Sequence, residues 1–335
     1  MRSLAGVVAC ALSLAGCFGP EAREGLRCTG DGDCPPGQDC YPVAGGPQPG
    51  ICSSSQPRAD GAPAVDAGSL AFGAPEPVEL TCVETPCESP RDPSLTGNRK
   101  QIAFTIPTLN AVGDFDVYIA TRPTAFDPWL PAQQAGAIDS LLVEEAGSLS
   151  DDGLRLFFTR DNQNAAGSPH GELLVSERLA EGDPFDSAVQ VPGVVNTDNG
   201  NERSAVRTAD ASRLLFARAL DSDLADHDVY VALEAGGQWD TVSRVEPVSQ
   251  ADADERSIAI VEGGEVNTLF VARGGQIIEA RWSGGYIAGA EVVSEHAELM
   301  VPGATVVSGV WAAPDGSEIW FGACGETCNV YRAVR

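Results

Sequence analysis

The chain has 335 residues, and its 48 acidic side chains outnumber its 21 basic ones, giving a net charge of −27. This charge argues against nucleic acid as a partner, because a phosphate backbone requires a basic surface. The 37 glycines and 23 prolines are typical of a turn-rich all-β protein, and the length allows one or two domains.

The first predicted element is a signal sequence at residues 1–16. Arg2 precedes an apolar run at residues 4–15, which is too short to cross a membrane as a mature helix and suits the core of a secretory signal. The run ends in Leu14-Ala15-Gly16-Cys17, which resembles the lipobox of bacterial lipoproteins.

The lipobox resemblance implies cleavage before Cys17 and attachment of acyl chains such as palmitate, which anchor the protein in a membrane. Phe18 follows the cysteine, and in lipoproteins a residue other than aspartate at this position favours the outer membrane. The alternative is an ordinary signal peptide in which Cys17 occurs by chance.

Residues 17–27 form a predicted polar tether, and residues 28–52 form a predicted cysteine-rich module. Its four cysteines, Cys28, Cys34, Cys40 and Cys52, lie among glycines and prolines that cannot build an apolar core, so the module needs disulfides. Three pairings are open. The spacing resembles that of small cysteine-rich modules in secreted bacterial proteins. Residues 53–71, rich in Ser, Ala, Pro and Gly, form a predicted linker.

A repeat begins at residue 72. Residues 149–161, LSDDGLRLFFTRD, combine a turn with an alternating strand, and the unit at residues 207–234 repeats the pattern. Copies occur at residues 95–122, 262–282 and 313–335. Each copy contains a strand ending near one of five phenylalanines: Phe104, Phe158, Phe216, Phe270 and Phe321. Aromatic-led segments begin at Phe72, Phe126, Phe185, Trp239 and Tyr286. A period near 50 residues with about four strands per unit indicates a β-propeller.

Residues 72–335 resemble the WD40-like repeats of TolB-type propellers, which implies a secreted or periplasmic ring. A complete blade needs four strands. The first aromatic-led segment supplies one strand and the last repeat supplies three, so pairing the two completes a blade, closes the ring and leaves no sheet edge exposed. This arrangement predicts five blades, the fifth shared by residues 72–80 and 305–335. Six blades would require hidden strands at residues 82–94.

The propeller contains four further cysteines. Cys82 and Cys87 enclose a proline turn, and Cys324 and Cys328 enclose a strand connection, so two local disulfides are predicted. The alternative is a cross-bridge between the two pairs that locks the ring.

No catalytic sequence motif is present. His170, His227 and His296 lie in turns or connections without a recurring partner. Three glutamates occupy the same position in successive repeats, just before an innermost strand: Glu145, Glu202 and Glu255. This pattern predicts an acidic rim that binds a cation or basic group. The alternative is a structural role in which the glutamates orient the turn through neighbouring arginines.

The acidic stretch Leu220–Asp228 is a candidate for a weak Ca²⁺ site, since oxygen ligands recur at alternate positions. The candidate ligands are Asp221, Asp223, Asp226 and Asp228. A solvated acidic loop is the alternative, and no other cofactor is expected.

These observations predict a monomeric, membrane-anchored lipoprotein of the cell envelope whose propeller binds a protein or glycan as a scaffold, without enzymatic activity. Loops on a rigid ring suit recognition, although the fold does not name the ligand. The alternative is a propeller glycoside hydrolase or lyase that uses central carboxylates. Unpaired carboxylates converging in the central pocket would favour the alternative.

Overall fold

The computed structural model describes residues 71–335, except 84–86, 108–114, 139, 141, 164–168, 221–225, 251–252, 263–265, 284–286 and 288–289. Before residue 71 it describes only the backbone of β1 (Arg27–Cys28), β2 (Asp39–Tyr41) and β3 (Gly50–Ser53), which form one antiparallel sheet in the order β1-β3-β2. The chain divides into two units, Met1–Ser69 and Leu70–Arg335. The predicted signal sequence, Cys17 and the side chains of the cysteine-rich module lie outside the described residues.

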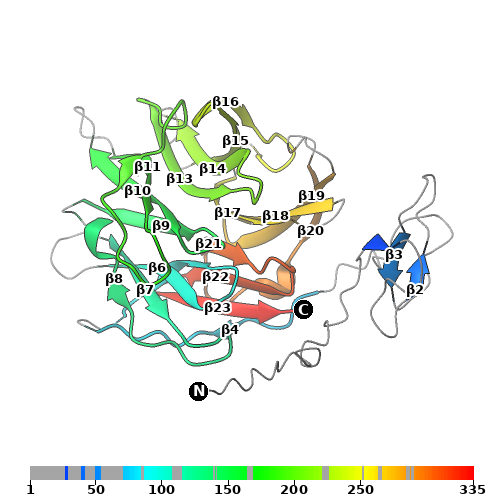
Figure 1. The fold of residues 1–335 in the computed structure, drawn as a ribbon. Coiled ribbons are helices and arrows are strands. Elements are labelled where there is room, and N and C mark those ends of the chain that lie inside the picture. Colours follow the sequence, from blue (N-terminus) through cyan, green and yellow to red (C-terminus); the bar gives the residue numbers. More distant parts are fainter. Residues whose placement is uncertain are drawn as a thin grey trace, which may run out of the picture. The chain divides into compact units, whose positions relative to one another are not determined.

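The second unit is a five-bladed β-propeller (Figure 1). Each blade is a four-stranded antiparallel sheet. The first blade contains β5 (Arg91–Leu95), β6 (Gln101–Pro107), β7 (Phe115–Thr121) and β8 (Gln133–Gln134). The second contains β9 (Glu144–Leu149), β10 (Arg155–Gln163), β11 (Pro169–Glu177) and β12 (Val189–Gln190). The third contains β13 (Gly200–Arg207), β14 (Arg213–Leu220), β15 (Asp228–Ala235) and β16 (Gln238–Arg244).

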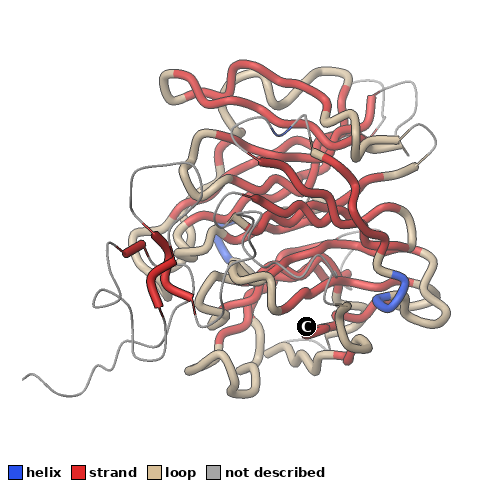
Figure 2. Tube along the Cα trace, turned by 90° about the vertical axis from the view of Figure 1, so that its right-hand side faces the viewer, coloured by secondary structure: helices blue, strands red, loops and turns tan. Residues whose placement is uncertain are grey.

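The fourth blade contains β17 (Glu255–Val261), β18 (Val266–Arg273), β19 (Gln276–Ser283) and β20 (Glu291–Glu295). The fifth contains β21 (Val306–Ala312), β22 (Glu318–Cys324), β23 (Cys328–Val334) and β4 (Glu76–Pro77). Strands dominate the described chain, and its two 3₁₀ helices are η2 (Gly136–Ile138) and η4 (Ala297–Leu299) (Figure 2). None of the helices described is long and apolar enough to span a membrane.

The ring closes as the repeat predicts. Strand β4 pairs with β23, placing Pro77 opposite Tyr331, so the fifth blade combines both ends of the propeller. Five blades are therefore confirmed, and the six-bladed alternative is wrong. Both local disulfides, Cys82–Cys87 and Cys324–Cys328, are formed, which rules out the cross-bridge.

The core lies between neighbouring blades. The five repeated phenylalanines are 0% exposed: Phe104, Phe158, Phe216, Phe270 and Phe321. Five apolar clusters each join residues of two adjacent blades, so every blade interface has its own core. Phe126 departs from the predicted aromatic pattern because it is 86% exposed. Trp129, which is partly buried, packs against the core nearby, with its ring 6.2 Å from that of Trp320.

A buried histidine lies at the ring closure. His296 Nε2 lies 3.1 Å from Glu279, and His296 Nδ1 lies 2.8 Å from Glu298, which also accepts the Phe72 backbone N–H. Arg335 lies 3.5 Å from Glu279 and above the Phe72 ring. Burial alone would lower the pKa of His296, but its bonds to the two carboxylates outweigh burial and raise it.

The His296 contacts predict a pH-dependent stability. A raised pKa in the folded state stabilises the fold fully below the unfolded value of ~6.5, and this contribution is lost as the pH rises through the folded value. We expect His296→Gln to lower the free energy of unfolding by about 1–3 kcal/mol near pH 6 and by less at higher pH. Urea unfolding of both proteins from pH 5.5 to 9 measures the difference, and a pH-independent difference would contradict the assignment.

Candidate functional site

The innermost strands β5, β9, β13, β17 and β21 line the central channel, and each contains a β-bulge. At the bulges, Asp92, Ala146 and Ser204 have positive φ angles of 54°, 53° and 53°, which non-glycine residues rarely adopt. Gly309 (φ 86°) lies against Asp92, since a Cβ at Gly309 would come within 2.3 Å of the Asp92 Cα. Such strain persists where the surroundings enforce it, and it often marks functional sites.

The channel contains a cavity of about 290 Å³ that extends from the bulges to the turns after the innermost strands. Its volume is near the lower limit of ~300 Å³ for small-ligand pockets. Its lining includes the serines Ser94, Ser148, Ser204 and Ser257 and the aromatic Trp311. The wall therefore combines an aromatic surface with polar groups that can hydrogen-bond a ligand.

Two carboxyl groups from different blades line this cavity without a cationic partner. Asp151 follows β9, and among the described residues its carboxylate has no hydrogen-bond or ion-pair partner. Glu262 follows β17 and accepts a hydrogen bond from the Ala209 backbone N–H. Burial raises the pKa of Asp151, with a further contribution from Asp152. Burial also raises the pKa of Glu262, to which Asp210 and Asp151 add.

The adjacent Asp152 is a turn residue. Its Oδ1 accepts hydrogen bonds from the Ser150 hydroxyl at 2.6 Å and the Leu154 N–H at 3.0 Å. Burial would raise the pKa of Asp152, but these hydrogen bonds overcome it and lower the pKa. The two neighbouring aspartates therefore have pKa values shifted in opposite directions.

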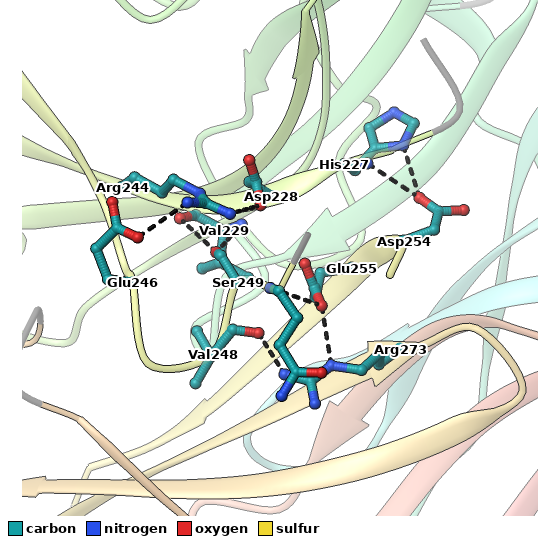
Figure 3. A network of polar contacts seen from close by, with 11 residues as sticks. His227, Asp228, Val229, Arg244, Glu246, Val248, Ser249, Asp254, Glu255 and Arg273 are labelled. Atoms are coloured by element: carbon teal, nitrogen blue, oxygen red, sulfur yellow. Dashed lines mark hydrogen bonds and ion pairs between the residues drawn. The ribbon is translucent and has the colours of Figure 1, made fainter. Parts of the chain in front are cut away.

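Two of the three predicted rim glutamates lie away from the channel. Glu202 and Glu255 are 0% exposed, and they pair with Arg218 and Arg273, each at 2.9 Å. Each arginine also donates to a backbone carbonyl of the connection before the innermost strand, as Figure 3 shows for Arg273 and Val248. The predicted rim is therefore wrong at these positions, because the side chains turn into the blade and anchor the connection.

The third predicted glutamate has a different environment. Glu145 contacts Arg203 and lies 2.9 Å from Arg91, so it bridges arginines of the first and third blades. The position equivalent to Glu202 is instead held by Glu144, which is 1% exposed and lies 2.7 Å from Arg160. The three predicted glutamates are therefore not brought together.

Burial raises the pKa values of the buried glutamates Glu144, Glu202 and Glu255. The pKa of Glu255 reaches about 8 despite the neighbouring Arg273. Glu202 accepts an additional hydrogen bond from the Thr197 hydroxyl at 2.8 Å, which favours its ionised form. These shifts accompany structural ion pairs, so they do not identify a catalytic site.

The histidines do not form a common site. His227 Nδ1 lies 2.9 Å from Asp254 (Figure 3), and Asp254 also contacts Arg256. Burial lowers the pKa of His227 although Asp254 opposes the shift. His170 Nδ1 lies 2.9 Å from the Gly200 carbonyl oxygen, and His296 lies at the ring closure.

The candidate Ca²⁺ ligands are only partly described. Asp221 and Asp223 lie outside the described residues. Asp228 lies 2.6 Å from Arg244, which neutralises its charge, and Asp226 is also engaged in an interaction. Within the described parts of the propeller, no group of three or more histidine, cysteine, aspartate or glutamate residues is arranged to hold a metal ion.

Comparison with known proteins relates the chain to other propellers by fold. No protein-family model and no curated protein matches its sequence. A thermostable family-43 glycoside hydrolase is 11% identical, with a TM-score of 0.54 over 76% of this chain and 90% of the other. The GH62 α-L-arabinofuranosidase catalytic domain of Coprinopsis cinerea is 7% identical, with a TM-score of 0.53 over 79% and 96%.

TolB of Acinetobacter baumannii is 14% identical, with a TM-score of 0.41 over 74% of this chain and 54% of the other. What the chain shares with the two glycoside hydrolases is the propeller fold.

These comparisons overturn one expectation. We expected a protein without enzymatic activity, whereas solved structures similar in fold are glycoside hydrolases. At 11% and 7% identity the likeness shows the fold alone, so the chemistry must be argued from the channel residues of this chain. The sequence reasoning assigned Asp151 to a turn and did not consider Glu262. The sequence signal that could have found both residues is their position in equivalent turns of two repeats, directly after an innermost strand.

Proposed function

We propose that the protein is a glycoside hydrolase that acts in the axial cavity, with Glu262 and Asp151 as its acid–base pair. The observation that carries this proposal is that two carboxyl groups from different blades line one cavity without a cationic partner and have raised pKa values. The glycoside hydrolases with a similar fold support the proposal.

Glycoside hydrolysis commonly requires one protonated carboxyl group and one carboxylate beside the scissile bond. Two carboxylates that repel each other do not ionise together readily, so one retains a proton at higher pH. The Ala209 N–H fixes the position of Glu262 but favours its ionised form. Burial, together with Asp210 and Asp151, outweighs this bond and raises the pKa of Glu262, which suits the acid that protonates the leaving oxygen. The Asp151 carboxylate accepts no hydrogen bond among the described residues, so it is available to act as the base that activates water.

Asp92 supplies a third carboxylate to the cavity from the first blade. It lies 3.7 Å from Arg91, and the Asp92–Gly309 contact fixes its backbone. A carboxylate held this way accepts hydrogen bonds from sugar hydroxyls and orients the ring. Asp92 is therefore assigned to positioning the substrate.

The proposal predicts hydrolysis of neutral glycosides by the native protein. We expect the full chain to release the chromophore from aryl arabinofuranoside, xyloside or glucoside, and to act at pH values above the ordinary glutamate pKa of ~4.3. Because Glu262 must be protonated, the rate should fall as the pH rises through its raised pKa. A pH–rate profile for each substrate measures both effects, and absence of turnover on all three would contradict the proposal.

A further inference from the structure

A second cavity adjoins the axial one. It has a volume of about 490 Å³ and lies between the second and third blades. Arg155, Phe157 and Arg207 line both cavities, so the two are neighbours across a shared wall. A molecule longer than the axial cavity can therefore continue into the space between the blades.

The side chain of Arg207 is available to a ligand at this junction. Among the described residues Arg207 has no ion-pair partner, and its buried Nε has no hydrogen-bond acceptor. Its guanidinium lies 5.7 Å from the centre of the Trp239 ring, while a backbone carbonyl 3.4 Å away accepts from Nη2. An unsatisfied buried donor is unfavourable, and a ligand oxygen at the junction would satisfy it.

The second cavity has an apolar floor and a polar edge. Phe157, Val191 and Trp239 are 5%, 3% and 6% exposed and form the floor. Val189 is 61% exposed at the outer edge of the same cavity. Apolar and aromatic surface with a few polar groups is typical of sites for uncharged organic ligands, and it suits the faces and hydroxyl edges of sugar rings.

The charge around the two cavities excludes acidic glycans. Their combined lining contains seven carboxylates and only two guanidinium groups, those of Arg155 and Arg207. Glu177 already pairs with Arg155 at 2.6 Å. A chain of uronic acids would therefore meet an excess of like charge, whereas a neutral chain would not.

We propose that the cavity between the second and third blades binds the continuing residues of a neutral oligosaccharide whose end occupies the axial cavity, with Arg207 hydrogen-bonded to the sugar at the junction. This inference rests on the proposed function for the identity of the ligand. It adds that the substrate is a chain and assigns its path to one particular blade interface.

Equilibrium binding tests the path independently of hydrolysis. Calorimetry of the full chain with neutral hexasaccharides of arabinose, xylose and glucose should find at least one that binds ≥10-fold more tightly than its monosaccharide, with hexagalacturonate failing to bind. We expect Val189→Asp to weaken the binding of that hexasaccharide about 10-fold and to leave the Kd of the monosaccharide within about twofold of the native value. Val293→Asp, on the outer strand of the fourth blade and 47% exposed, is the matched control.

The outcomes separate the two proposals. Equal binding of the hexasaccharide to Val189→Asp and the control overturns the assigned path, as does equal binding of hexasaccharide and monosaccharide or the absence of any binding. Hexasaccharide binding that depends on Val189, together with no turnover of any glycoside, supports the path and contradicts the hydrolase. Arg207→Gln should also weaken hexasaccharide binding. Circular dichroism checks that each variant is folded.

Discussion

The Glu262→Gln variant is expected to lose about 100- to 10,000-fold in kcat/KM on whichever aryl glycoside the native protein cleaves, because general acid catalysis contributes a factor of this size. Glutamine keeps an acceptor for the Ala209 N–H but has no proton to give to the leaving oxygen. The loss should shrink on substrates with activated leaving groups, which need less protonation. Initial rates on glycosides with leaving groups of different pKa measure both effects.

Glu246→Gln is the matched control, since the Glu246 side chain is 70% exposed and, among the described residues, pairs with Arg244 alone. It should retain native activity. Activity of Glu262→Gln within threefold of native would remove Glu262 from the mechanism, and retention of folding by circular dichroism is needed for either conclusion.

The Glu202→Ala variant is expected to lose about 3–5 kcal/mol of unfolding free energy, because it leaves the charge of Arg218 buried without its partner. The Glu202 side chain is 0% exposed and that of Arg218 only 9%, so water cannot replace the lost carboxylate. Arg218 also donates to the Val195 carbonyl at 2.6 Å, so the connection before β13 should loosen with it. Urea unfolding at pH 7 measures the change.

Glu177→Ala provides the comparison, because the Arg155–Glu177 pair is exposed on both sides, at 38% and 62%. Its removal should cost at most about 1 kcal/mol. If Glu202→Ala and Glu177→Ala destabilised the fold equally, the buried pair would not anchor the connection as we infer.

The fold was predictable because its signals recur. The five repeated phenylalanines occupy equivalent positions in the five blades. The number of strands at each end of the propeller required the two ends to pair in one blade. Phe126 shows the limit of this reasoning: it has the spacing of the other leading aromatics, but Trp129, three residues later, is the one that packs against the core. Spacing does not reveal which of two nearby aromatic side chains turns inward.

The site was less predictable because it depends on contacts between blades. Glu145 and Glu144 are adjacent, and only the bulged pairing of β9 with β10 shows which one matches Glu202. Asp151 and Glu262 lie more than 100 residues apart, and only the closed ring brings their turns to one cavity. Cys17, its lipidation and the envelope location stay predictions, as do the pairings in the cysteine-rich module.

The pairing of β4 with β23 has a consequence for how the chain folds during its synthesis. Pro77 leaves the ribosome long before Tyr331, so the first four blades emerge while the fifth sheet is still missing strands from one end. Until Tyr331 arrives, the nascent chain carries unpaired strand edges, which invite pairing with other chains. The propeller can therefore complete its ring only after β23 has been translated, and a chain that stops before β23 should aggregate.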